Sequence, residues 1–192
     1  PIWLWNGLPE NILLVIDSAY AEFVMADDYE AGAELAERAK NVVMARTFSK
    51  IYGLAALRLG WCYASEEVID VLNRVRGPFN ITGPALAAGL AAVADQEHVD
   101  KARRHNDKWL RRLAGECAKI GLETLPSVGN FMLLRFAAGG ARDAKAADAF
   151  LTARGILARN VDSYHLPDCL RVSIGLDHEM DALLDALKEF MA

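Results

Sequence analysis

A lysine and an arginine stand inside an otherwise apolar stretch, TFSKIYGLAALRLG, at positions 47–60 of this 192-residue chain. Lys50 follows a run that is typical of a buried strand, and the carboxyl ends of such strands are where α/β sheets bind ligands. Partial burial favours the neutral, nucleophilic form of an amine, which can then form a Schiff base. A solvated lysine on a surface loop is the alternative interpretation.

Arg58 follows Lys50 by eight residues and stands at the entry to another apolar run. A charge in that position needs an anion, and the planar fork of a guanidinium suits phosphate. The hydroxyl groups of Thr47 and Ser49 can donate further hydrogen bonds. The stretch therefore predicts a lysine nucleophile beside a phosphate site. The alternative for Arg58 is an ion pair, or a stem lying along apolar surface with its head in water.

An acid, Asp17, ends the earlier apolar run NILLVID. It could hold magnesium in a nucleoside triphosphatase, although the chain contains no P-loop sequence G-x-x-x-x-G-K-[ST]. It could instead pair with a protonated pyridine nitrogen and keep a pyridoxal ring electron-withdrawing. Tyr20, three residues on, could then donate its phenol hydroxyl to the ring oxygen of that cofactor. A third interpretation is that Asp17 only caps the turn that follows its strand.

The elements that would position these residues alternate between strands and helices. Short runs rich in apolar and β-branched residues predict three strands, at 11–17, 41–47 and 57–64. Helical patterns cover 30–40, 65–76 with Ser65 as N-cap, and 83–95, whose small residues predict tight packing. This strand–helix–strand order indicates an α/β sheet.

A long charged helix over about 96–120 precedes a change of pattern. The strands predicted after it are 130–136, 156–161 and 169–175. The helices predicted there are 143–154, with Gly155 past its end, and 177–191, with Asp177 as its cap. This half of the chain is predicted to be a compact α+β unit.

The composition argues against several classes of protein. A net charge of −5 offers no footprint for nucleic acid or an anionic membrane, and 53% apolar residues support a sizeable core. Three well-separated cysteines are no disulfide framework and favour a cytoplasmic protein with reduced thiols. The four histidines lack ligand spacing, so no metal site is predicted, and no apolar run reaches the length of a membrane helix.

The motifs together resemble a known family. TFSKIYGLAALRLG, with VIDSAYAEF upstream, is similar to the aspartate-aminotransferase superfamily of fold-type I pyridoxal-phosphate enzymes, and most closely to its histidinol-phosphate aminotransferase branch. RGPFNIT, VGNFMLLRF, GILARNV and LPDCLRVSIG follow in the order of the family. The resemblance implies that residues 1–95 are the C-terminal part of the large α/β/α domain that binds pyridoxal phosphate. Residues 96–192 would be the connecting helix and an α+β small domain.

The resemblance also implies roles for individual residues. Lys50 would bind the cofactor covalently and later carry the proton of the substrate. The implied cofactor-binding residues are Asp17, Tyr20, Thr47, Ser49, Lys50 and Arg58. The implied substrate-binding residues are Arg159, Arg171 and Asn130, although either arginine could also be a surface residue of its strand. The implied substrates are an amino acid and a 2-oxo acid or imidazole-acetol phosphate, and the implied assembly is a homodimer.

The chain departs from the family at its beginning. A glycine-rich phosphate loop, a stacking aromatic ring and an Asn-Pro-Thr-Gly turn precede the Asp strand in the family, and they are missing from this sequence. We therefore expect about the C-terminal half of an enzyme, inactive by itself, with unpaired strand edges and exposed apolar surface. Four alternatives remain: an aromatic-amino-acid aminotransferase, a threonine-phosphate decarboxylase, a fragment of a P-loop nucleoside triphosphatase and a non-catalytic fragment.

Overall fold

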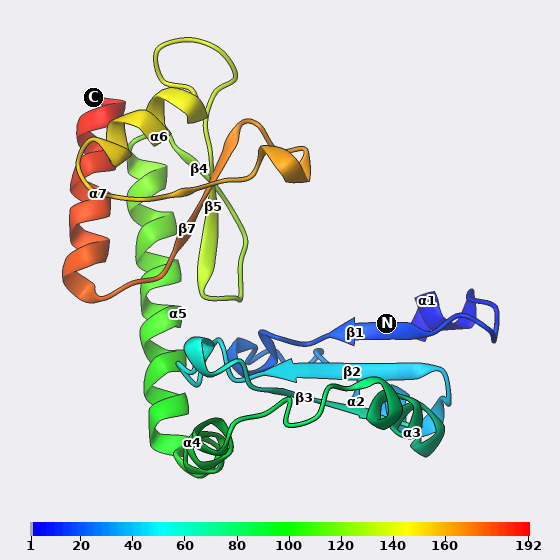
Figure 1. Ribbon diagram of the computed structural model, residues 1–192. Coiled ribbons are helices and arrows are strands. Elements are labelled where there is room, and N and C mark those ends of the chain that lie inside the picture. The colour runs from blue at the N-terminus through cyan, green and yellow to red at the C-terminus, as the bar shows by residue number, and fades with distance from the viewer. Residues whose placement is uncertain (1) are drawn as a thin grey trace. The chain divides into compact units, whose positions relative to one another are not determined.

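In the computed structural model, which describes residues 2–192, the chain divides into two compact units (Figure 1). The first unit ends at Arg103 and the second begins at Arg104. Each unit has a sheet of its own. The boundary between functional domains that we expect after residue 95 stays a prediction.

A three-stranded sheet in the order β1–β2–β3 forms the centre of the first unit. β1 (Leu14–Asp17) pairs in parallel with β2 (Val42–Thr47), and β3 (Gly60–Ala64) pairs with β2 in antiparallel fashion. The three strands predicted in this half are thus confirmed, although each begins later than predicted. Since β1 and β2 are parallel, their carboxyl ends lie at the same edge of the sheet.

Four helices belong to the first unit before the long helix begins. They are α1 (Ile2–Asn6), α2 (Ala33–Arg38), α3 (Glu66–Val75) and α4 (Gly83–Ala94). α2 packs on β2 through a small apolar cluster that includes Leu35, Val42 and Met44. α4 is buried along one edge only, at Ala85 and Gly89, so the tight packing predicted for it is local.

The predicted N-cap residue of α3 is confirmed, but its side chain bonds elsewhere. Ser65 stands at the N-cap position, but its side chain makes no capping hydrogen bond. Its hydroxyl donates instead to the carbonyl of Lys40, at 3.0 Å. The side chain therefore ties the start of α3 to the residue before β2, because that acceptor lies within reach of the hydroxyl.

A four-stranded antiparallel sheet in the order β4–β5–β7–β6 forms the second unit. Its strands are β4 (Glu123–Leu125), β5 (Phe131–Arg135), β6 (Arg159–Asn160) and β7 (Cys169–Ser173). Its helices are α5 (Gln96–Lys119), which starts in the first unit, α6 (Ala144–Thr152) and α7 (Asp177–Met191). β4 was not predicted, because three residues are too few to show an alternating pattern.

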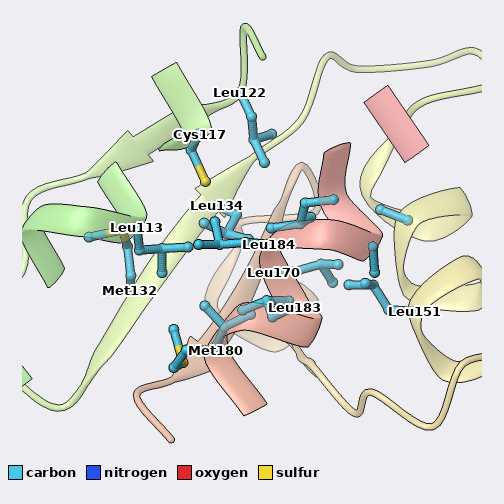
Figure 2. Close-up of a cluster of buried hydrophobic side chains, with 14 of the residues drawn as sticks. Leu113, Cys117, Leu122, Met132, Leu134, Leu151, Leu170, Met180, Leu183 and Leu184 are labelled. Carbon is cyan, nitrogen blue, oxygen red and sulfur yellow. The ribbon is translucent and has the colours of Figure 1, made fainter. Parts of the chain in front are cut away.

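The core of the second unit lies between this sheet and its helices (Figure 2). Met132 and Leu134 on β5 are buried, as is Leu170 on β7, while the residues between them face the other side of the sheet. Leu113 and Cys117 of α5 are four residues apart and fully buried, so they extend one face of the helix into this cluster. Burying a large apolar side chain contributes about 1.5–3 kcal/mol, which makes this core the main source of the unit's stability.

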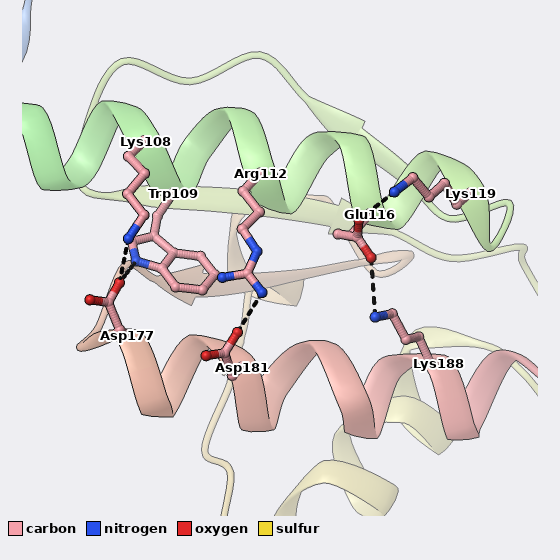
Figure 3. A network of polar contacts seen from close by, with 8 residues as sticks. All are labelled: Lys108, Trp109, Arg112, Glu116, Lys119, Asp177, Asp181 and Lys188. Carbon is pink, nitrogen blue, oxygen red and sulfur yellow. Dashed lines mark hydrogen bonds and ion pairs between the residues drawn. The ribbon is translucent and has the colours of Figure 1, made fainter.

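Polar contacts join α5 to α7 along the edge of that core (Figure 3). Asp177 is not the cap of α7 that the sequence predicted, since the N-cap residue is Leu176. Its carboxylate accepts a hydrogen bond from Trp109 Nε1 at 2.6 Å and pairs with Lys108 Nζ at 2.9 Å, and these contacts lower the pKa of Asp177. Glu179 takes the capping role, because its carboxylate accepts from the Leu176 amide at 2.7 Å.

None of the helices within residues 2–192 has the length and apolar character that crossing a membrane requires.

Candidate active site

Asp17 and Tyr20 lie just beyond the end of β1. The exposed carboxylate of Asp17 accepts a hydrogen bond from the Ala19 amide at 3.1 Å, so the turn-capping role considered from the sequence is present. Tyr20 precedes a short 3-10 turn, Ala21–Phe23, and its ring packs against Phe23 with the centroids 6.4 Å apart. The turn thus fixes the backbone of Tyr20, while the exposed carboxylate of Asp17 stays accessible to a ligand.

Lys50 lies in a tight turn that follows β2. The Thr47 hydroxyl accepts from the Ser49 amide at 3.0 Å, and the Gly53 amide donates to the Lys50 carbonyl at 2.9 Å. Gly53 has a φ of +70°, a backbone conformation that residues with a side chain rarely adopt, so a glycine at this position lets the turn close. The Lys50 ammonium lies 5.0 Å from the centroid of the Tyr20 ring. The segments after β1 and β2 therefore meet at this amine and this phenol.

Arg58 lies two residues before β3 and reaches back toward the same turn. Its Nη1 donates to the Ala55 carbonyl at 2.5 Å and lies 3.5 Å from the Ser49 hydroxyl. Its φ of +52° is unusual for a residue with a long side chain, and such strain occurs preferentially at functional sites. The rest of the fork is exposed, so Arg58 and Ser49 offer a guanidinium and a hydroxyl to an anion.

These groups fit an aldehyde that carries a phosphate ester. The Lys50 amine lies near the Tyr20 phenol ring, and the Arg58 guanidinium lies near the Ser49 hydroxyl. Lys50 and Ser49 belong to the turn after β2, and Tyr20 belongs to the segment after β1. Strand pairing puts Asp17 at the same sheet edge, since it lies opposite Ala45, two residues before Thr47. The six cofactor-binding residues predicted from the sequence therefore share one edge of one sheet.

Sequence reasoning missed an ion pair that links β2 to the turn after β1. Arg46 Nε lies 3.6 Å from Glu22 Oε1, and the two side chains are only 20% and 11% exposed. Burial raises the pKa of nearby Tyr52, and the charge of Glu22 adds to this effect. An arginine inside the apolar run NVVMART was the available signal, but its partner is distant in the sequence.

The two predicted substrate-binding arginines lie in the second unit and face each other across two strands. Arg159 on β6 and Arg171 on β7 are direct partners in the antiparallel pairing. Like charges placed opposite each other repel, so the pair favours an anion that both can bind. Arg171 lies over the Phe131 ring at 5.1 Å, and within the described residues its buried Nε has no hydrogen-bond partner.

A cavity of about 560 Å³ adjoins this pair and has both arginines in its lining. Ser173 of β7 and His178 of α7 also line it. Asn130, the third predicted substrate-binding residue, directly precedes β5, and its carbonyl accepts from the Ile174 amide at 2.9 Å. Arg159 and Arg171 therefore belong to the sheet of the second unit and Asn130 directly precedes one of its strands, whereas the predicted cofactor-binding set belongs to the first unit.

Comparison with known proteins identifies the family. The family described as aminotransferase class I and II matches residues 7–187, nearly the whole chain. The chain belongs to the class I and II aminotransferases. This membership overturns the interpretation of Asp17 as the magnesium ligand of a P-loop nucleoside triphosphatase.

Curated relatives of this aminotransferase chain are histidinol-phosphate aminotransferases. The protein of Paramagnetospirillum magneticum is 53% identical over 185 residues, which are 96% of this chain and 51% of that protein. The protein of Maricaulis maris is 50% identical over 188 residues, 98% of this chain and 52% of that protein. The chain thus spans about half the length of the curated relatives it matches.

A solved structure agrees with this assignment. The histidinol-phosphate aminotransferase of Sinorhizobium meliloti, crystallised in complex with pyridoxal-5'-phosphate, superposes with a TM-score of 0.88 at 33% identity. The match covers 99% of this chain and 51% of that one. The mixed α/β architecture is therefore that of about half of a fold-type I aminotransferase, as the sequence predicted.

Proposed function

We propose that this chain is part of a pyridoxal-phosphate-dependent histidinol-phosphate aminotransferase of histidine biosynthesis. The observation that carries the proposal is the meeting of Lys50 with Tyr20, and of Arg58 with Ser49, at one sheet edge of an aminotransferase chain. The reaction would exchange an amino group between glutamate and imidazole-acetol phosphate. By analogy with the family, the enzyme would act as a cytoplasmic homodimer.

The residues of the first unit would bind the cofactor and move the proton. Lys50 would hold the cofactor covalently, and its freed Nζ would take the proton from the alpha carbon of the substrate. Asp17 would pair with the pyridine nitrogen, and Tyr20 would donate to the phenolic oxygen. When bound, the protonated pyridine ring supplies the electron withdrawal that transamination requires.

The remaining residues would bind oxyanions. Ser49, Thr47 and Arg58 would hold the phosphate of the cofactor through hydroxyl and guanidinium groups. Arg159 and Arg171 would bind the anionic groups of the substrates, because a guanidinium fork can donate hydrogen bonds to a carboxylate and to a phosphate alike. That property would let one pair of arginines serve both glutamate and a phosphate-bearing substrate.

The test is chemical fixation of the cofactor in a protein that joins this chain to the upstream part its relatives have. Borohydride reduction followed by peptide mapping should place the cofactor on Lys50, and Lys50→Ala should abolish the adduct. Lys40→Ala, which removes a lysine paired with Glu67 on the surface, is the matched control and should keep it. A label on another lysine, or on none, would refute the proposal.

Substrate comparison separates the two related activities that remain as alternatives. Turnover of histidinol phosphate well above that of phenylalanine supports the proposed substrate, and the opposite ranking supports an aromatic-amino-acid aminotransferase. Release of carbon dioxide from threonine phosphate would instead indicate a decarboxylase.

A further inference from the structure

The first turns of α5, which belong to the first unit, contact both segments that carry the candidate cofactor-binding residues. Figure 1 shows α5 (green) starting beside the loop that follows β2 (cyan), and His98 Nε2 lies 3.0 Å from the Ile51 carbonyl. One turn further on, Arg103 Nε donates to the Glu22 carbonyl at 2.7 Å. Ile51 follows Lys50 directly, and Glu22 lies two residues after Tyr20.

An apolar cluster fills the space between these two hydrogen bonds. Val99 of α5 is buried together with Ile51 and Phe23, and Tyr20 and Tyr52 pack against this cluster. The helix therefore touches the Lys50 segment and the Tyr20 segment through one continuous patch. Each segment also bends sharply, so its own turn bonds leave carbonyl groups that need donors from elsewhere.

We propose that His98 and Arg103 are positioning residues, which hold the backbones of Lys50 and Tyr20 at the separation that the cofactor requires. This inference rests on the proposed function. A lysine that must reach one carbon atom of a bound cofactor depends on a fixed backbone, because a shift of about 1 Å is enough to impair such a reaction. His98 restricts the backbone motion of the segment that carries Lys50, and Arg103 restricts that of the segment that carries Tyr20.

The chemistry of the first contact is a donated hydrogen bond. The Ile51 carbonyl is an acceptor only, so the imidazole of His98 must carry its hydrogen on Nε2. Glutamine can supply an amide N–H at a similar distance from the backbone. Glutamate has the same shape but, when ionised, only acceptors, so it would repel the carbonyl. His98→Gln and His98→Glu therefore match in shape and differ in the donor and in charge.

The second contact is supported from both sides. The Arg103 guanidinium also pairs with Asp100 at 2.8 Å, which holds it in place along α5. The side chain of Glu22 pairs with Arg46 of β2. The turn after β1 is therefore held at the backbone carbonyl of Glu22 by α5 and at the side chain of Glu22 by β2.

The experiment measures cofactor affinity in the protein that joins this chain to the upstream part its relatives have. We expect His98→Glu to weaken pyridoxal-phosphate binding about tenfold, as expected when a half-buried carbonyl loses its donor, and His98→Gln to stay within about twofold. The pH dependence of the visible absorbance of the lysine-bound cofactor should shift in His98→Glu only. Lys101→Ala, an exposed residue of the same helix, should behave as the wild type.

Arg103 supplies an independent pair of variants in case His98→Glu fails to fold. Arg103→Lys keeps a donor, and Arg103→Met keeps the apolar stem alone, so only the second should weaken cofactor binding. Equal affinity and equal absorbance profiles in all variants would overturn the inference while leaving the adduct on Lys50 intact. A weakening by His98→Gln equal to that by His98→Glu would also overturn it. A wild-type protein without an adduct on Lys50 would refute the proposed function itself, and the inference with it.

Discussion

Lys50 and Arg58 are fixed by constraints on their backbones more than by packing of their side chains. Gly53, with its positive φ, closes the turn after Lys50, and Arg58 itself takes up a left-handed conformation. Gly60 completes the arrangement, because a Cβ at this position would lie 2.8 Å from the Arg46 carbonyl. The absence of a side chain at Gly60 thus lets β3 approach β2 beside the candidate site.

Replacement of Gly60 by alanine should therefore reduce the free energy of unfolding by about 1–3 kcal/mol, since the obstructing atom belongs to the backbone and cannot rotate away. Chemical denaturation of the purified chain measures this change. Gly77→Ala is the control, because a Cβ at Gly77 would meet nothing within 4 Å, and it should unfold like the wild type. Equal stability of the two variants would show that β3 can move without penalty.

At the scale of elements, α5 and α7 are joined by a line of charges that follows the apolar core of the second unit (Figure 3). Glu116 of α5 lies between Lys119 of its own helix, at 2.5 Å, and Lys188 of α7, at 3.1 Å. Hydrogen bonds from Lys119 and Lys188 lower the pKa of Glu116 from 4.5 to about 2. The ionised carboxylate is therefore favoured in the folded state.

A carboxyl group whose pKa is lower in the folded state adds stability above its unfolded pKa, and this stability is lost as the pH falls. Glu116→Gln should consequently melt at a lower temperature than the wild type near neutral pH, and the difference should vanish between pH 4.5 and about 2. Thermal melts over this range test the expectation. A difference for Glu116→Gln that persists at the acidic end would contradict the assignment.

At the scale of the whole molecule, the two units differ in how much apolar surface they cover. The second unit encloses a large core between its sheet and its helices. The first has a three-stranded sheet with two unpaired edges, and Trp61 and Tyr63 on β3 are exposed, as are Val15 on β1 and Leu90 on α4. Phe79 is 96% exposed and has a positive φ. The sequence predicted exposed apolar surface of this kind, which is typical of surfaces that contact further protein.

The chain alone should therefore bind pyridoxal phosphate weakly or not at all. Its sheet edge carries the proposed covalent site and one proposed oxyanion site, but this sequence contains neither the stacking aromatic ring nor the glycine-rich phosphate loop that the resemblance implies. Titration of the 192-residue chain with the cofactor, followed by visible absorbance, measures this directly. Stoichiometric binding would show that the residues present are a sufficient site.

The sequence by itself was enough to predict the family and most of the elements, and to propose the cofactor chemistry. The spacing of the motif TFSKIYGLAALRLG depends on local turn geometry. Alternating and helical patterns depend on which side of an element is buried, so residues close together in the sequence are enough to predict both. The strands around Asp17, Lys50 and Arg171 were predicted for that reason, with errors mainly at their ends.

Only the tertiary structure decided which distant groups meet. Asp177 was predicted to cap its own helix but binds Trp109, 68 residues away, and His98 binds the carbonyl of a residue 47 positions earlier. The direct pairing of Arg159 with Arg171 likewise depends on the register of β6 and β7. Local patterns carry no information on such pairs, because the partner of a long polar side chain is set by how strands and helices pack, and packing is a property of the whole fold.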